Sequence, residues 1–268
     1  MNSVIIEKYN ARVDTIGSLL CVGLDSSLDR LPARFLAEEH PQFTFNRHII
    51  QQTYAYAAAF KPNIAFYEAR GAAGLTDLAL TMDYLREHHP YVLTICDAKR
   101  ADIGSTNEGY VTAILDHLGF DAVTLNPYLG RAALAPFLAR ADKGCILLCR
   151  TSNPGAGEFQ DLDVGGKPLW QVVAEQVSQE WNSNGNCMLV AGATYPDELA
   201  QIRALVGAMP LLVPGIGAQG GDVEKTVRAG LDSDGQGLII NSSRGIIFAA
   251  DPGVVARDLR TEINGYRW

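Results

Sequence analysis

The sequence predicts an α/β protein, a single (β/α)8 barrel of the TIM type with an extra N-terminal helix. Three observations lead to this prediction. Short apolar runs alternate with helical segments eight times along the chain. The runs are continuously apolar, as in parallel strands that are buried on both faces. The length of 268 residues suits one such barrel, so we expect one domain over residues 1–268.

The expected elements follow one another in order along the chain. The N-terminal stretch Met1–Ala11 carries Glu7 and Lys8 within a helical pattern, which gives the extra helix. The predicted strands are Leu19–Leu24, Ala59–Ala65, Tyr91–Cys96, Ala122–Leu125, Cys145–Cys149, Cys187–Val190, Leu211–Val213 and Gly237–Ile240. The predicted helices are Arg47–Ala58, Thr76–His88, Ser105–Leu118, Ala132–Ala139, Leu169–Trp181, Pro196–Val206, Asp222–Ala229 and Pro252–Asn264. The longest irregular segment, Ser152–Pro168, follows the fifth strand, and a loop of that length at the active end of a barrel suggests a lid.

Composition limits the classes of partner. The net charge is −8 and the basic residues are scattered, which disfavours binding to nucleic acid or to an anionic membrane surface. No apolar run reaches membrane-spanning length and no apolar signal segment opens the chain, so we expect a cytoplasmic protein. The five cysteines form no Cys-x-x-Cys pair and their number is odd. They therefore favour buried thiols in a reducing compartment over a disulfide framework.

Polar residues cluster where the predicted strands end, which is where barrels of this class carry their active sites. The third strand leads into Asp97 and Lys99, which share a face because side chains two apart on a strand point the same way. Asp102 follows just beyond, so an acid, a lysine and a second acid are expected to crowd at one strand tip. The other strand ends add Asp25, Lys61, Asn126, Ser152, Gln219, Ser243 and Arg244. Packing alone does not explain so many polar groups on one rim.

A glycine-rich segment, Pro214–Gly220, follows the seventh strand and contains G-x-G-x-x-G with Gly217 at its second glycine. A dinucleotide-binding fold would carry that motif on its first βα unit, so we set this interpretation aside. Barrels bind phosphate after strands seven and eight, where this segment and Arg244 fall. Backbone N–H groups and a guanidinium suit a phosphate monoester.

Metal binding is the competing use of the carboxylates. Asp25, Asp97 and Asp102 could in principle hold Mg²⁺, which prefers oxygen ligands. Two ammonium groups, Lys61 and Lys99, stand on the same rim and offset much of the charge that would attract a cation. The five histidines show no ligand spacing, so we expect no metal site and no histidine relay.

Five segments in register resemble the orotidine 5′-phosphate decarboxylase family, in particular its longer bacterial subgroup. They are Phe60–Asn63, Asp97–Thr106, Thr151–Gly155, Pro214–Gln219 and Asn241–Gly245. The resemblance spans Leu19 to about Ile247. It implies removal of CO₂ from C6 of orotidine 5′-phosphate to give UMP, with no metal or organic cofactor.

The resemblance also implies a role for each matching residue. Lys99 matches the lysine that protonates C6, Asp97 would face the departing carboxylate, and Lys61 would bridge Asp97 and the ribose. Further matches are Asp25 to a ribose-hydroxyl acceptor, Ser152 to a pyrimidine contact, and Gln219 and Arg244 to phosphate ligands. Asp102, Ile103 and Thr106 match residues that cross a dimer interface, so the resemblance implies a homodimer with shared active sites.

Two other functions remain open from the sequence. One is a related barrel that uses Mg²⁺ to stabilise an enediolate from a sugar phosphate, although its relatives carry a carboxylate where this chain has Lys61. The other is a non-catalytic barrel that senses a nucleotide, although phosphate binding alone would not need Lys99.

Overall fold

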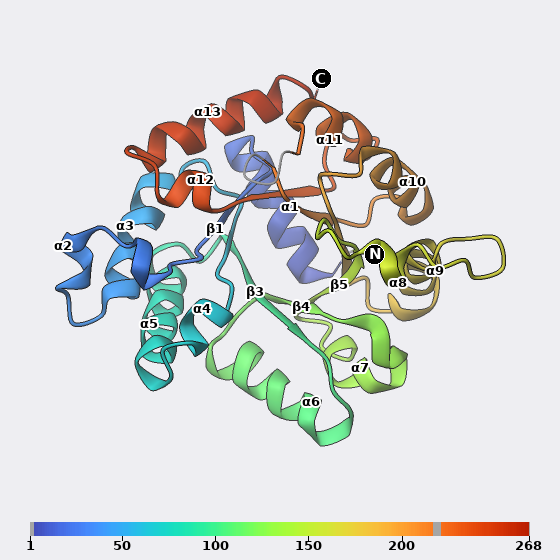
Figure 1. The fold of residues 1–268 in the computed structure, drawn as a ribbon, viewed down its shortest axis with the longest axis horizontal. Coiled ribbons are helices and arrows are strands. Elements are labelled where there is room, and N and C mark those ends of the chain that lie inside the picture. The colour runs from blue at the N-terminus through green and yellow to red at the C-terminus, as the bar shows by residue number, and fades with distance from the viewer. Residues whose placement is uncertain (1–2, 217–220, 268) are drawn as a thin grey trace.

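Eight parallel strands close into a barrel in which each strand pairs with its neighbours in sequence and β8 pairs with β1 (Figure 1). The computed structural model describes residues 3–216 and 221–267. The strands are β1 Leu20–Gly23, β2 Ala59–Lys61, β3 Leu93–Arg100, β4 Ala122–Leu125, β5 Gly144–Arg150, β6 Cys187–Ala191, β7 Leu211–Pro214 and β8 Leu238–Ser242. The predicted (β/α)8 barrel is therefore confirmed, with all eight strands in the predicted order.

Helices surround the barrel on the outside, as Figure 1 shows. The helices longer than one turn are α1 Val4–Ile16, α3 Pro41–Thr53, α5 Ala72–His88, α6 Gly104–Val111, α7 Gly130–Leu138, α9 Leu169–Gln176, α10 Pro196–Val206, α11 Val223–Gly230 and α13 Pro252–Asn264. Short helices are α2 Ala33–Leu36, α4 Ala65–Glu68, α8 Gly157–Gln160 and α12 Arg244–Ile247. Two helices end in wide π turns, Thr112–His117 after α6 and Val177–Trp181 after α9, and 3-10 turns form at Leu28–Arg30 and Pro127–Leu129.

The extra N-terminal helix, α1, lies across the N-terminal end of the barrel. Its apolar face is buried, and the Tyr9 hydroxyl donates to the carbonyl of Leu238 at the start of β8. Lys8 forms an ion pair of 2.8 Å with Asp121, just before β4. These contacts close the end of the barrel opposite the predicted active rim. The helix continues past the predicted end at Ala11, as far as Ile16.

Several predicted boundaries are wrong, among them the start of α5, which begins at Ala72 and not at Thr76; the next three have local reasons. The second strand stops at Lys61 because Pro62 has no N–H for the ladder, and the residues from Ala65 form α4 instead. The third strand runs on to Arg100, four residues past the predicted end. The helix predicted over Arg47–Ala58 is α3, which begins earlier with Pro41 in its first turn, a position that proline favours. Residues 54–58 instead lead into β2.

The segment after β5 is ordered around short contacts. The Thr151 N–H donates to Gln160 Oε1 at 2.9 Å, and Gln160 Nε2 donates back to Thr151 Oγ1 at 2.8 Å. Buried Arg150 lies 3.1 Å from Asp161 of the same segment. The stretch predicted as irregular therefore includes α8 and is fixed to the end of β5.

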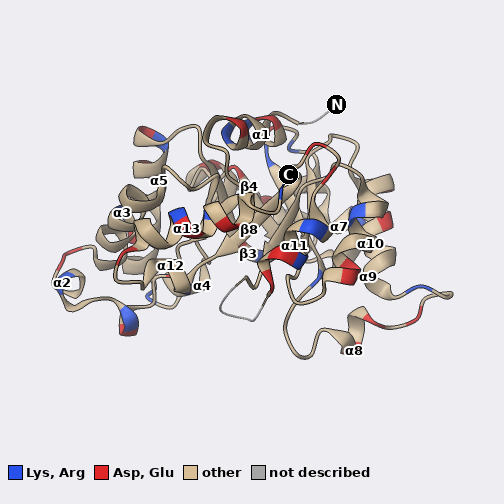
Figure 2. Cartoon of the chain, turned by 90° about the horizontal axis from the view of Figure 1, so that it is seen from above, with Lys and Arg blue, Asp and Glu red and all other residues tan. Residues whose placement is uncertain are grey.

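Charge and cysteines agree with the sequence analysis. Lysines and arginines alternate with acidic residues around the outer helices (Figure 2). The five cysteines are all free and buried, as expected. None of the helices in the described ranges is long and apolar enough to cross a membrane.

Candidate active site

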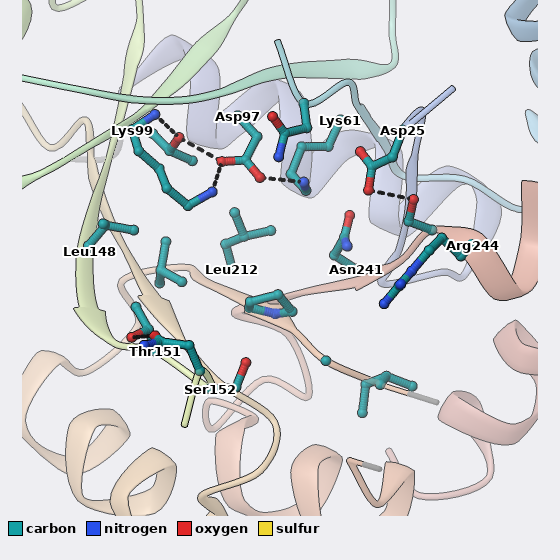
Figure 3. Close-up of a pocket in the computed structure, with 18 of the residues that line it drawn as sticks. Asp25, Lys61, Asp97, Lys99, Leu148, Thr151, Ser152, Leu212, Asn241 and Arg244 are labelled. Carbon is teal, nitrogen blue, oxygen red and sulfur yellow. Dashed lines mark hydrogen bonds and ion pairs between the residues drawn. The ribbon is translucent and has the colours of Figure 1, made fainter. Parts of the chain in front are cut away.

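A cavity of about 500 Å³ opens at the C-terminal end of the barrel strands. That volume lies in the range of small-molecule sites. Figure 3 shows side chains from several strands converging on it. Its polar lining residues are Asp25, Lys61, Asn63, Asp97, Lys99, Thr124, Thr151, Ser152, Asn153, Gln160, Asn241, Ser243 and Arg244.

Two lysines hold the two oxygens of one carboxylate. Lys61 Nζ lies 2.8 Å from Asp97 Oδ2, and Lys99 Nζ lies 2.5 Å from Asp97 Oδ1 (Figure 3). Burial alone would raise the pKa of Asp97, but the Lys61 and Lys99 ammonium groups outweigh it and hold that pKa well below its usual range. Burial alone would lower the pKa of Lys61, but Asp97 and Asp25 reverse that shift and raise it. Asp97 and Lys61 therefore both stay charged at neutral pH.

Lys99 adopts an unusual backbone conformation. Its φ of 46° is the one positive value among the non-glycine residues that the structure describes. A lysine in the left-handed region costs about 1–2 kcal/mol, and such strain concentrates at functional sites. The turn brings Lys99 Nζ back over Asp97, while half of the Lys99 side chain stays exposed to the cavity. Its ammonium is therefore held in place yet open to a bound molecule.

Asp25 and Arg244 occupy the other side of the cavity, at the ends of β1 and β8 (Figure 3). The Ser243 hydroxyl lies 2.7 Å from Asp25 Oδ2 and orients this carboxylate. The second oxygen of Asp25 is buried without a hydrogen-bond partner among the described residues. Gly23 makes this arrangement possible, because a Cβ there would lie 2.7 Å from Ser243 Cβ. Asp25 therefore lines the cavity with one of its two oxygens unpaired among the described residues.

Apolar side chains complete the wall beside the lysine–carboxylate array. Leu148 and Leu212 are drawn there in Figure 3, and Val190 joins them from β6. Low polarity on this side strengthens any charge interaction inside the cavity. The arrangement can therefore bind a molecule that has an anionic end near Arg244 and an apolar face near Leu148.

Comparison with known proteins decides the family. Residues 18–259 match the family model described as orotidine 5′-phosphate decarboxylase / HUMPS family. The chain belongs to this family. It is 50% identical over 257 residues to an orotidine 5′-phosphate decarboxylase of Azoarcus sp. (strain BH72), covering 93% of this chain and 94% of that one. A second relative with the same name, from Janthinobacterium sp. (strain Marseille), is 48% identical over 268 residues and covers 97% and 98%.

The fold agrees with solved members of the decarboxylase family. The structure of Leishmania donovani OMP decarboxylase superposes with a TM-score of 0.89 at 40% sequence identity. The match covers 100% of this chain and 99% of that chain. The resemblance seen in five short segments therefore extends over the whole barrel.

Most residues that we singled out from the sequence line the decarboxylase-family cavity. They are Asp25, Lys61, Asp97, Lys99, Ser152, Ser243 and Arg244. Gly217 and Gln219, predicted to contact phosphate, lie outside the described residues. Pro214, the last residue of β7, pairs with Asn241 of β8, and Arg244 follows three residues after Asn241. The chain therefore leaves β7 for Gly217 and Gln219 close to the end of β8.

The loop after β3 points away from the cavity. Asp102 lies apart from Asp97 and Lys99, so the expected crowding of these three side chains does not occur within one chain. The Asp102 backbone N–H instead donates to Asn107 Oδ1 at 2.9 Å, and its carboxylate accepts from the Ile103 N–H at 2.7 Å. The extension of β3 to Arg100 carries the chain outward before Asp102 is reached. Ile103 and Thr106 are exposed there.

Asn126 also lies elsewhere. It does not line the cavity; its Oδ1 accepts from the Tyr128 N–H at 3.0 Å and caps the 3-10 turn after β4. Asparagine at such a cap satisfies an N–H that has no partner in the turn. The side chain borders a separate apolar hollow of about 750 Å³ beside α9. Its position after a strand therefore reflects turn chemistry.

Several cavity residues escaped the sequence analysis. Asn63 and Asn241 belong to motifs quoted for the resemblance, but neither was assigned a position in the site. Thr124 lies inside the four-residue apolar strand β4. In such a strand, only the alternation of side chains between the two faces indicates which of them point inward. No group of three or more histidine, cysteine, aspartate or glutamate side chains suited to a metal occurs in residues 3–216 and 221–267.

Proposed function

We propose that this chain decarboxylates orotidine 5′-phosphate to UMP and CO₂, with Lys99 delivering the proton to C6. The Lys61–Asp97–Lys99 array in the cavity of a decarboxylase-family barrel is the observation that carries the proposal. A fixed ammonium beside an apolar wall is what a carbanion at C6 requires. Asp97 contacts both ammonium groups of the array before substrate arrives.

The cavity supports one orientation of this substrate. The phosphate lies at Arg244 and the ends of β7 and β8, the usual phosphate position in barrels. The ribose hydroxyls face Asp25, whose buried oxygen has no partner among the described residues, and Lys61. The pyrimidine then lies between Lys99 and the apolar wall, with Ser152 at its edge. Phosphate, ribose and pyrimidine thus lie in the order in which the cavity presents Arg244, Asp25 and Lys99.

The chemical step places an electron pair on C6. The bond from C6 to the carboxylate breaks, CO₂ leaves, and the pair left on C6 takes a proton from Lys99 Nζ. At about 4 Å, two unit charges attract by on the order of 4 kcal/mol in a medium of effective dielectric 20. Asp97 lies beside the departing carboxylate and keeps the Lys99 ammonium in place. Binding energy from the phosphate and the ribose supplies the rest of the acceleration.

A second copy of the chain completes the site in this proposal. Asp102 is on the loop after β3 and Thr106 is in the first turn of α6, on either side of Ile103, which is 64% exposed. The neighbouring loop after β4 exposes Tyr128 and Leu129. Such a group of exposed apolar side chains is typical of a surface covered by a partner. A homodimer formed here would carry Asp102 to the partner's cavity.

The thiols support a cytoplasmic location for the enzyme. All five cysteines are free and buried, and thiols persist in reducing compartments. We therefore place the enzyme in the cytoplasm.

An assay with orotidine 5′-phosphate tests the proposal against the alternatives. The purified chain is incubated with substrate, with and without EDTA, and loss of the orotate absorbance is followed. We expect turnover at the same rate in both samples, because both Asp97 oxygens are already engaged by ammonium groups. Turnover that EDTA abolishes would favour a Mg²⁺-dependent barrel, and binding of UMP without turnover would favour a nucleotide sensor.

A further inference from the structure

Thr124 lies at the junction of β3 and β4, directly behind the lysine–carboxylate array. Its side chain is almost completely buried. The Thr124 hydroxyl lies 3.0 Å from Asp97 Oδ1. The same oxygen lies 3.0 Å from the Ala98 N–H and 2.9 Å from the Lys99 N–H. One side chain therefore contacts the carboxylate and the backbone that carries both charged residues.

These three contacts use the whole hydrogen-bonding capacity of the hydroxyl. A threonine hydroxyl has one proton to donate and two lone pairs to accept with. The proton goes to Asp97, since an ionised carboxylate can only accept, and the two N–H groups take the lone pairs. Nothing remains for a bound substrate, although Thr124 borders the cavity. Its contribution must therefore act through Asp97 and Lys99.

The pairing of the two strands explains why a side chain is needed here. Cys96 pairs with Val123 and Arg100 pairs with Leu125, so three residues of β3 face one residue of β4. Such a bulge interrupts the ladder and leaves backbone groups unpaired. The Thr124 hydroxyl accepts from two of these N–H groups, at the point where Lys99 has its positive φ. The bulge re-aims Lys99, and Thr124 stabilises the bulge.

We propose that Thr124 is a positioning residue for decarboxylation: its hydroxyl holds the bulge that turns Lys99 Nζ over Asp97. This inference rests on the proposed function, in which Lys99 delivers a proton to C6. Thr124 affects the rate of the chemical step by fixing the direction of Lys99. We expect little change in substrate binding, because Asp25 and Arg244, the proposed ligands of a ribose hydroxyl and the phosphate, lie on the other side of the cavity.

Three substitutions separate the hydroxyl from the shape of the side chain. Thr124→Val keeps the shape and removes the hydroxyl, whereas Thr124→Ser keeps the hydroxyl and removes a methyl group. The matched control is Thr94→Val, on β3 at the opposite end of the barrel. Buried Thr94 likewise has its Oγ1 3.0 Å from a carboxylate, that of Asp121, and 3.0 Å from a backbone N–H. Both valine variants therefore lose a buried hydroxyl next to an aspartate, but only one lies at the cavity.

We expect Thr124→Val to lower kcat roughly 10- to 100-fold with little change in KM, since small misplacements of a reacting group cost this much. Thr124→Ser should restore most of kcat, and Thr94→Val should keep the wild-type kcat even if its Tm falls. Wild-type kcat in Thr124→Val, or equal losses in the valine and serine variants, would overturn the proposal. If Thr124→Val does not fold, Thr124→Ala compared with Thr124→Ser gives the same test.

A crystal structure of Thr124→Val separates this inference from the proposed function. We expect the φ of Lys99 to leave the left-handed region and its Nζ to move away from Asp97. That result holds whether or not the wild-type chain decarboxylates orotidine 5′-phosphate. An unchanged Lys99 backbone would overturn the positioning role, and an inactive wild type with the expected shift would contradict the proposed function alone.

Discussion

Lys61 Nζ lies 2.8 Å from Asp97 Oδ2 at the bottom of the cavity, where the two side chains are only 5% and 12% exposed. Because both side chains have lost most of their hydration, each charge is stabilised mainly by the other. The same carboxylate holds Lys99, which is half exposed. The buried pair therefore holds in place the carboxylate that the exposed Lys99 ammonium contacts.

Replacement of Asp97 by asparagine should destabilise the fold in a pH-dependent way. The pKa of Asp97 is depressed, so its contribution is present above the unfolded value near 4 and is lost as pH falls. The pKa of Lys61 is raised, so its contribution is present below about 10 and is lost as pH rises further. At pH 7 we expect a loss on the order of 3 kcal/mol in the free energy of unfolding.

Urea unfolding of wild type and Asp97→Asn between pH 3 and pH 8 measures this difference. It should stay constant from pH 8 to about pH 5 and narrow below about pH 4. The control is Asp83→Asn, whose ion pair with Arg86 is exposed and should contribute less than about 1 kcal/mol. A difference that persists unchanged at pH 3 would contradict the electrostatic account.

Arg244→Ala should selectively weaken catalysis on phosphorylated substrate. If the guanidinium binds the phosphate, kcat/KM for orotidine 5′-phosphate should fall roughly 100-fold, while slow decarboxylation of orotidine should change little. Arg228→Ala is the control, because Arg228 lies on α11 and pairs with Glu224 at the surface. Equal losses for the two substrates would reject a phosphate contact.

Mixing of two inactive variants should restore activity if Asp102 works in the partner's cavity. In a mixed dimer of Lys99→Ala and Asp102→Asn chains, one of the two sites has both residues intact. Random exchange then gives about one quarter of wild-type activity. The control mixes Lys99→Ala with Lys61→Ala, which line the same cavity and should give no recovery. Absence of recovery after verified subunit exchange would contradict a shared site.

Arg203 should matter for stability alone. Its guanidinium donates to the carbonyls of Gly207, Met209, Gly230 and Gly237, close to where β7 and β8 begin. Arg203→Met removes the donor from all four carbonyls, of which, among the described residues, only that of Gly237 keeps another, the Leu211 N–H, so we expect a loss of about 2–4 kcal/mol in unfolding free energy. The kcat of the folded enzyme should be unchanged, because the cavity is at the other end. A lowered kcat in fully folded Arg203→Met would contradict the view that this end of the barrel does not affect the cavity.

The sequence predicted the fold well because a parallel barrel repeats one simple pattern. Each strand is buried on both faces, so the eight apolar runs stand out from the amphipathic helices. Boundaries failed where a single residue changed the local chemistry. Pro62 stopped β2 before its apolar run ended, and the bulge let β3 continue through charged residues.

The site was only partly predictable for a related reason. Asp97 and Lys99 do contact each other, but a left-handed turn brings them together, and strand alternation does not foresee such a turn. Asn126 has the right position after a strand and serves as a cap. Thr124 carries no sequence signal, because its role depends on the register of two strands that are distant from each other in the unfolded chain.

The role of Lys99 is tested most directly by measuring both the decarboxylation rate of Lys99→Ala and its affinity for UMP. If Lys99 delivers the proton to C6, kcat for orotidine 5′-phosphate should fall roughly 1,000-fold or more. Calorimetry should still show UMP binding, because Asp25 and Arg244 are untouched. A variant that binds UMP and keeps kcat within about tenfold of wild type would contradict the central role of Lys99.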